Sequence, residues 1–232
     1  VWKTDLGDMQ GRRLDLKFPH RENEMAQCQA ANHTRLANTW VHNGMINIDG
    51  TKMSKSLGNV RWAKDLIAQF GGNVVRWVMI SVQYRALMNL TDEVFDVAIK
   101  ELNKIQNAYK QACLQMELAN IQRGNQLDDD LWKSFIDALN DDLNTPNAIT
   151  TVLDTVKSIN QNIRKRPVDF DQISKLVYTL ERELYVLGIE FEPLKLTEQD
   201  KEMYTAWRKA VKEKDFITAD QYRLTLQEKG II

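Results

Sequence analysis

The sequence contains only two cysteines in 232 residues, Cys28 and Cys113. Two cysteines without paired spacing do not build a disulfide framework, and their scarcity fits a reducing cytosol. The chain also has no run of about 18 apolar residues and no basic-then-apolar signal pattern at its start, which argues against a membrane span and a secretory peptide. We therefore expect a cytoplasmic protein without a membrane partner.

An excess of positive charge is missing as well. Lys and Arg total 31 against 32 Asp and Glu, so no global positive field indicates a nucleic-acid partner. Any contact with RNA must then be local. The 43% of hydrophobic residues is enough to bury a core in one or two domains.

Hydrophobic periodicity predicts a mainly helical chain with a short strand-containing segment near the start. Glu22–Asn32 is rich in helix-forming residues and follows Pro19, which a helix start tolerates. Trp40–Gly50 alternates in places and contains Asn-Gly and Asp-Gly, which predict a short hairpin ending in a turn. Further helices are expected around Leu66–Phe70 and over Val74–Ile80, Asp92–Leu118, Asp130–Leu139, Pro146–Ile163, Asp169–Leu187, Thr197–Lys214 and Phe216–Gly230.

The best candidate linker is the polar, glycine-containing stretch Asn120–Asp129. With the change to helical periodicity near Trp62, it divides the chain into three expected regions. These are residues 1–60, 61–118 and 119–232.

The segment Lys52-Met53-Ser54-Lys55-Ser56 carries the clearest chemistry. Two lysines three residues apart, with hydroxyls between and after them, can neutralise a triphosphate whose negative charge shifts during reaction. For an arbitrary lysine-rich loop, a solvated surface turn is the commoner explanation.

This segment is identical to the signature loop of class I aminoacyl-tRNA synthetases, and its flanks Ile48–Thr51 and Leu57–Asn59 also resemble that family. The resemblance implies a loop that closes over ATP, brought as its Mg²⁺ complex. Lys55 is then the expected phosphate ligand, with Lys52 assisting and Ser54 beside them.

Upstream, Phe18-Pro19-His20-Arg21-Glu22-Asn23-Glu24 resembles the cysteinyl branch of that family. His20 and Glu24 lie four residues apart, so on a helix they share a face and can reach one metal ion. The resemblance implies that they are zinc ligands and that the zinc binds the thiolate of the substrate cysteine. A histidine at a helix start beside a surface Glu is the alternative. Cys28 continues the spacing, but at 1.5 Å per residue it starts roughly 12 Å from His20, too far for one ion.

The likeness covers nearly the whole chain. Ile80–Arg85 resembles the family's connection to its stem-contact helices, and Leu139–Pro146 resembles the opening of its helical anticodon-side domain. Lys212–Gly230 resembles its late helical hairpin. The implied fold is the C-terminal part of a Rossmann-type nucleotide-binding domain, followed by stem-contact helices and a helical tRNA-binding bundle.

The sequence also departs from the family. None of its histidines, His20, His33 and His42, forms a His-x-Gly-His motif, and two zinc cysteines expected upstream are absent. Gly11-Arg12-Arg13-Leu14-Asp15 replaces a glycine-rich approach, and Arg21 replaces a histidine. We therefore expect the C-terminal half of a synthetase, inactive by itself, whose zinc affinity is weak or lost.

The leading hypothesis is thus a cysteine–tRNA ligase, a monomer acting on cysteine, ATP and the cysteine tRNA. A non-catalytic module that binds RNA or protein is the second hypothesis, and a related ligase acting on a small-molecule amine is the third. Trp207 is a candidate for reading an RNA base. Candidate phosphate contacts are Arg164, Lys165, Arg166, Arg208, Lys209 and Lys212.

Overall fold

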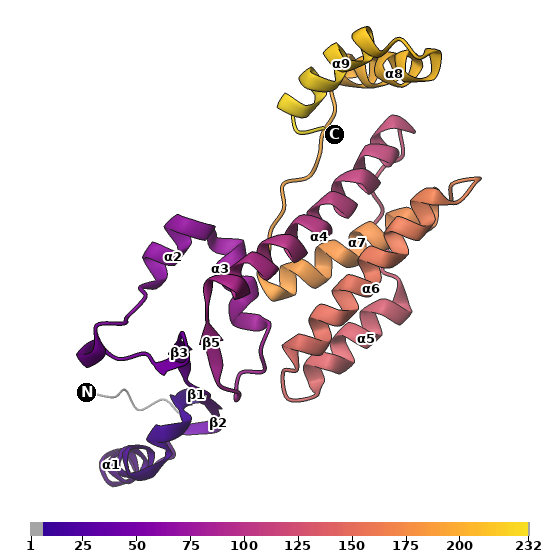
Figure 1. Cartoon of the computed structure of the whole chain (residues 1–232). Coiled ribbons are helices and arrows are strands. Elements are labelled where there is room, and N and C mark those ends of the chain that lie inside the picture. The colour runs from indigo at the N-terminus through magenta and orange to yellow at the C-terminus, as the bar shows by residue number, and fades with distance from the viewer. Residues whose placement is uncertain (1–6, 232) are drawn as a thin grey trace. The chain divides into compact units, whose positions relative to one another are not determined.

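The computed structural model describes residues 7–231 and divides into two compact units (Figure 1). The first unit holds the described residues up to Ile99 and also the short segment Asp142–Pro146. The second holds Lys100–Asp141 and the chain from Asn147 onward. No helix among residues 7–231 is both long enough and apolar enough to cross a membrane.

A two-stranded parallel sheet opens the first unit. Strand β1 (Gly7–Arg13) pairs with β2 (Ala37–Asn43), in a register that sets Gln10 opposite Trp40. Parallel strands need a long crossover, and here it contains helix α1 (Glu22–Asn32). The helix ends at His33, which takes the left-handed conformation typical of a helix C-terminus.

A second sheet has the strand order β4-β3-β5. Strand β3 (Ile46–Ile48) is antiparallel to β4 (Thr51–Lys52) and parallel to β5 (Met88–Leu90). The β3–β4 turn consists of Asp49 and Gly50, both at positive φ, which is the geometry that tight hairpins favour.

This arrangement corrects part of the hairpin expected over Trp40–Gly50. Its second half is a hairpin, but Trp40 to Asn43 pair in parallel with β1 and turn away at Gly44. Asn-Gly marks the end of one strand there, because Gly44 is needed for a close approach to another segment of backbone.

Helices complete the first unit. Its core contains Trp77 and Phe95, both 0% exposed, and the ring of Phe95 stacks on that of Phe70 with centroids 4.3 Å apart. Apolar residues at helical spacing bury one face of each helix around this core. The helices are α2 (Ala63–Phe70), α3 (Gly72–Ile80) and the first turns of α4 (Asp92–Leu118).

The second unit is a helical bundle. Phe135, Ile159 and Leu180 are fully buried, one from each of three helices that follow α4. Acidic N-caps start two of them: Asp128 accepts from the Leu131 amide and Asp169 from the Gln172 amide. These helices are α5 (Asp129–Asn140), α6 (Thr145–Arg164) and α7 (Phe170–Leu187).

The C-terminal part of this unit is a pair of packed helices, α8 (Glu198–Glu213) and α9 (Phe216–Glu228). Thr197 and Asp200 form a reciprocal capping box at the start of α8. Leu226 and Ile231 pack with Leu114 of α4 in a buried cluster, flanked by Leu118, Leu194, Leu196, Met203, Tyr204 and Trp207.

The prediction of a mainly helical chain is confirmed, as are each of the expected helices and the irregular linker. Glu22–Asn32 and Asp92–Leu118 have the predicted bounds, and the other helices differ by one or a few residues at their ends. The proposed boundaries at residues 60/61 and 118/119 remain predictions.

Candidate functional site

The lysine loop begins at the last residue of β4 and ends in a short 3-10 turn, Lys55–Leu57. The Met53 amide donates to the carbonyl of Ile46 (3.2 Å), which anchors the start of the loop to β3. Gly58, at φ 67°, closes the turn by donating to the carbonyl of Lys55 (3.2 Å). Both lysines are exposed. Lys52 Nζ lies 3.8 Å from Asp15 Oδ2, whereas Lys55 makes no ion pair with any of residues 7–231.

Two asparagines that sequence reasoning missed hold this loop in place. Asn59 accepts from the Ser54 amide (2.9 Å) and donates to the carbonyl of Lys52 (3.2 Å), bridging the two sides of the loop. Asn89 of β5 accepts from the Gly50 amide (2.8 Å). The role of Asn59 could have been predicted, because this residue lies in the segment that flanks the motif. That of Asn89 could not, because it is 39 residues away from its partner Gly50.

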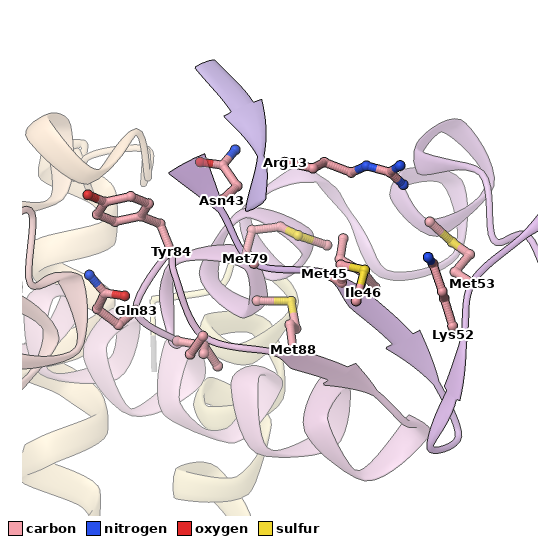
Figure 2. Close-up of a pocket in the computed structure, with 13 residues that line it drawn as sticks. Arg13, Asn43, Met45, Ile46, Lys52, Met53, Met79, Gln83, Tyr84 and Met88 are labelled. Carbon is pink, nitrogen blue, oxygen red and sulfur yellow. The ribbon is translucent and has the colours of Figure 1, made fainter. Parts of the chain in front are cut away.

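A pocket of about 350 Å³ opens beside the loop (Figure 2). That volume is at the lower end of the range for small-molecule sites, and the wall is mostly apolar, with four methionines. Figure 2 shows Lys52 and Met53 on one side of the pocket and Gln83 and Tyr84 on the opposite side. The lining residues are Arg13, Asn43, Gly44, Met45, Ile46, Lys52, Met53, Met79, Val82, Gln83, Tyr84, Ala86 and Met88.

Gly44 fixes one wall of this pocket. A Cβ atom there would collide with the carbonyl oxygen of Ala86 and lie 2.8 Å from that of Arg85. The Gly44 amide donates to the carbonyl of Tyr84 (2.7 Å), and the Met88 amide donates to that of Met45 (2.9 Å). The segment after α3 is thus bonded to the chain that leads into β3 and the lysine loop.

The two expected zinc ligands are in different surroundings. His20 is exposed just before α1, while Glu24 is half-buried in its first turn and ion-paired with Arg12. The second carboxylate oxygen of Glu24 is buried without a partner among residues 7–231. Within that range no group of three His, Cys, Asp or Glu side chains could hold a metal ion. Two donors, one already bound to a guanidinium, do not by themselves fit zinc, which requires three or four ligands.

The arginines that depart from the family pattern each have a partner. Arg12 binds Glu24, and Arg13 lies 3.2 Å from Asp15 at the pocket. The Arg21 guanidinium sits 4.9 Å from the ring centroid of Trp40. Burial, followed by the positive charges of Arg21, Lys17 and Arg85, lowers the pKa of His42, so this imidazole is neutral at pH 7.

Both cysteines lie in the interior. Cys28 is 8% exposed on α1 and Cys113 is 1% exposed on α4. Burial raises the pKa of Cys113 to about 11, so its thiol stays protonated and unreactive at neutral pH. The interpretation of Cys28 as a small helix residue agrees with this placement.

The candidate RNA contacts fall into two groups. At the end of α6, Lys165 Nζ donates to Asn162 Oδ1 (3.0 Å) and Arg166 Nη1 donates to two backbone carbonyls. On α8, the side chains of Arg208, Lys209 and Lys212 are exposed, with no ion pair to the described residues. Trp207 is half-buried and packs edge-on against Tyr204, with ring centroids 5.3 Å apart, and its candidate role in reading an RNA base stays a prediction.

Comparisons with known protein families match two parts of the chain. Residues 5–100 match the catalytic domain of class I (C) tRNA synthetases, and residues 134–192 match the DALR domain. The first match contains the lysine loop, the pocket and the His20/Glu24 pair. The second contains α6 and α7.

Curated relatives match over the whole chain. The cysteine–tRNA ligase of Mesoplasma florum is 32% identical over 232 residues, which are 100% of this chain and 52% of that protein. The cysteine–tRNA ligase of Staphylococcus saprophyticus is 37% identical over 237 residues, 97% of this chain and 50% of that protein. The chain thus spans about half the length of the curated relatives it matches, and it corresponds to a C-terminal half.

Solved structures support the same fold. A leucyl-tRNA synthetase of Agrobacterium radiobacter in complex with tRNA superposes with a TM-score of 0.61 at 15% identity, covering 80% of this chain and 27% of that one. Mycobacterium tuberculosis methionyl-tRNA synthetase with methionyl-adenylate gives 0.53 at 19% identity, covering 78% and 40%. At these identities the likeness concerns the fold alone. The expected Rossmann-type portion followed by helices is thereby confirmed.

Proposed function

We propose that the chain belongs to the cysteine–tRNA ligases among the class I aminoacyl-tRNA synthetases, and that the protein of which it forms a part activates cysteine with ATP and transfers it to the cysteine tRNA. The observation that carries this proposal is the loop from Lys52 to Ser56, held at the mouth of a mostly apolar pocket by Asn59. Relatives that bear this name match the loop, the pocket and the helical unit together.

The activation step requires stabilisation of a leaving pyrophosphate. The cysteine carboxylate attacks the α-phosphorus of ATP, the bond to the β-phosphate oxygen breaks, and cysteinyl-adenylate and pyrophosphate result. Lys55 is exposed and has no ion pair among residues 7–231, so its ammonium group is available to neutralise the phosphates of Mg²⁺-ATP. Lys52 can contribute a second positive charge once its long contact with Asp15, 3.8 Å between Nζ and Oδ2, is broken. The pocket beside the loop offers an apolar surface for the adenine ring.

In the transfer step, a terminal ribose hydroxyl of the tRNA attacks the carbonyl carbon of the adenylate, and AMP leaves. The helical unit supplies exposed cations for the RNA backbone, among them Arg208, Lys209 and Lys212 on α8, which form no ion pair with the described residues. We place the protein in the cytoplasm as a monomer, where ATP, cysteine and tRNA meet.

Zinc has a narrower place in the proposal. His20 and Glu24 would be two of its ligands, and the ion would contribute recognition of the substrate thiolate. Because Arg12 pairs with one carboxylate oxygen of Glu24, its positive charge opposes a cation at the other oxygen, and we expect weak zinc binding by these residues.

Cysteine-dependent exchange of labelled pyrophosphate into ATP tests this function. The chain would be assayed alone and together with the N-terminal half of a cysteine–tRNA ligase, with Lys55→Ala as the test variant. Lys64→Ala serves as the matched control, since Lys64 is also an exposed lysine and lies on α2, outside the loop. We expect no exchange by the chain alone and exchange by the combination, reduced at least 100-fold by Lys55→Ala alone, as for loss of one preorganised charge contact. Exchange that survives Lys55→Ala would contradict the role of the loop, and silence of the combination would favour a non-catalytic RNA- or protein-binding module.

A further inference from the structure

The turn between α5 and α6 has an uncommon backbone. Asp142 and Leu143 have φ values of 53° and 54°, in the left-handed region that residues other than glycine seldom adopt. Burial does not compensate for this, because Leu143 is 53% exposed. Strain that persists without a packing reason suggests that the turn serves to present a side chain.

That side chain is the carboxylate of Asp142, which joins three consecutive residues of the segment after α3. Arg85 donates through Nη2 to Oδ1 (2.9 Å), and its Nε lies 2.9 Å from Oδ2, a two-pronged arrangement. The Tyr84 hydroxyl donates to Oδ1 (2.8 Å), and the side-chain Nε2 of Gln83 donates to Oδ2 (3.4 Å). The hydrogen bonds from Arg85 and then Tyr84 lower the pKa of Asp142, so the carboxylate is ionised at neutral pH.

Two of these three residues, Gln83 and Tyr84, belong to the wall of the pocket, and Arg85 lies between Tyr84 and the lining residue Ala86 in sequence. Gln83 and Tyr84 line it opposite Lys52 (Figure 2). The carbonyl of Tyr84 accepts from the Gly44 amide, and Gly44 leads through Met45 into β3. The hairpin partner of β3 is β4, which ends at Lys52, the first residue of the lysine loop. A continuous series of bonds therefore runs from Asp142 to the pocket, all within the first unit.

We propose that Asp142 is a positioning residue for the nucleotide pocket: it holds the segment from Gln83 to Met88 in place and so sets the affinity for ATP. This proposal rests on the proposed function. The chain on either side of Asp142–Pro146 belongs to the helical unit, so the anchor is covalently continuous with α5 and α6.

The first test measures the anchor without any enzymatic activity. Amide hydrogen exchange would be followed by mass spectrometry in the 232-residue chain, comparing wild type, Asp142→Asn and the control Asp92→Asn. Asp92 forms an exposed ion pair with Arg61 at 3.1 Å in the same unit and does not contact the pocket. We expect exchange at Ala86 and Met88 to be about fivefold faster in Asp142→Asn only, in keeping with the strength of an exposed ion pair of good geometry. Unchanged exchange there would overturn the proposal.

The second test uses the full-length ligase and separates KM from kcat in pyrophosphate exchange. Asp142→Asn and Arg85→Ala should each raise the KM for ATP about fivefold with kcat within twofold, and the double variant should be no worse than either single one. Faster amide exchange with an unchanged KM would overturn the link to the pocket. Lack of exchange activity in the wild-type ligase would instead refute the proposed function, while hydrogen exchange would still decide whether Asp142 anchors the segment.

Discussion

Lys229 Nζ lies 2.6 Å from Asp200 Oδ1, which joins the residue after α9 to the first turn of α8. Asp200 also accepts from the Thr197 amide (3.0 Å) and hydroxyl (2.6 Å). One buried carboxylate therefore caps the start of α8 and holds the end of α9 against it. The hydrogen bonds from Lys229 and then from Thr197 lower the pKa of Asp200 to about 2.

Asp200→Ala should therefore lower the free energy of unfolding of the helical unit by about 1–2 kcal/mol, the usual cost of losing a helix cap. Because the folded pKa lies below the ordinary value of 3.8, this stabilisation is present above that value and is lost as the pH falls through about 2. Urea denaturation at pH 7 measures it, with Asp220→Ala as the control for an exposed pair within α9. Equal losses in the two variants would contradict the role of Asp200.

Glu183 on α7 is 0% exposed, and burial raises its pKa to about 8 despite a neighbouring Thr155 hydroxyl. Thr155 Oγ1 lies 3.1 Å from Glu183 Oε1 and 3.2 Å from the carbonyl of Thr151. A protonated carboxyl suits this arrangement, because it can donate to Thr155 while the hydroxyl donates to Thr151.

The folded pKa of Glu183 is raised, so its stabilising contribution is complete below about 4.5 and is lost as the pH rises toward 8. Glu183→Gln, which is neutral throughout, should exceed wild type in unfolding free energy at pH 8 by on the order of 2–4 kcal/mol, and the difference should vanish near pH 4. Thermal unfolding across this pH range tests the prediction, with the exposed Glu192→Gln as control. A pH-independent difference would show that Glu183 does not titrate as described.

Gly44→Ala should disrupt the pocket, because the added methyl group meets backbone at Ala86 and Arg85 that cannot rotate away. We expect a loss of at least about 2 kcal/mol in the first unit, as for overpacking at a rigid position, together with loss of pyrophosphate exchange by the full-length ligase. Gly11→Ala is the matched control, since nothing lies within 4 Å of a Cβ atom there. Similar melting curves for both variants would contradict the close approach.

Asn59→Ala should loosen the lysine loop without removing either lysine. It deletes the two hydrogen bonds that join Ser54 and Lys52 across the loop, each worth about 1 kcal/mol. The KM for ATP in pyrophosphate exchange should rise severalfold. Asn38→Ala, at an exposed position of β2 outside the loop, provides the comparison, and an equal effect there would argue against a specific role of Asn59.

Arg12→Ala should strengthen zinc binding. The guanidinium of Arg12 is the present partner of Glu24, so its removal frees a half-buried carboxylate four residues from His20. Competition for zinc with a chromophoric chelator should show that Arg12→Ala binds zinc at least tenfold more tightly than wild type. The double variant Arg12→Ala/Glu24→Ala should show no such increase in zinc affinity. Unchanged affinity would mean that Arg12 does not compete with the metal.

Local patterns predicted most of the fold. The helices at Glu22–Asn32 and Asp92–Leu118 were readable because apolar periodicity and start signals act over neighbouring turns. The lysine loop was readable because its residues are contiguous. The partnership of Trp40 with β1 was not, because strand pairing depends on chain segments far apart in sequence.

The supporting contacts of the site were beyond sequence reasoning for the same reason. Asn89 reaches Gly50 across 39 residues, and Asp142 reaches Arg85 across 57. In the sequence Glu183 looks like an ordinary polar position of a helix. Only the structure shows that its side chain is fully buried, which is the reason that its carboxyl is neutral. Arg12 was noticed as a departure from the family, but its pairing with Glu24 requires the crossover from β1 to α1.

The return of Asp142–Pro146 to the first unit also governs how this protein can be divided or recombined. A truncation at residue 118 removes the carboxylate and leaves Arg85, Tyr84 and Gln83 without their common acceptor. A chimera that carries the helical bundle of another ligase also carries that ligase's turn between the equivalents of α5 and α6. The contact is kept only if that turn presents an acceptor for the Arg85 guanidinium. Exchange of the helical unit between such enzymes is therefore constrained by the five residues Asp142–Pro146. They lie within the helical unit in sequence but pack with the first unit.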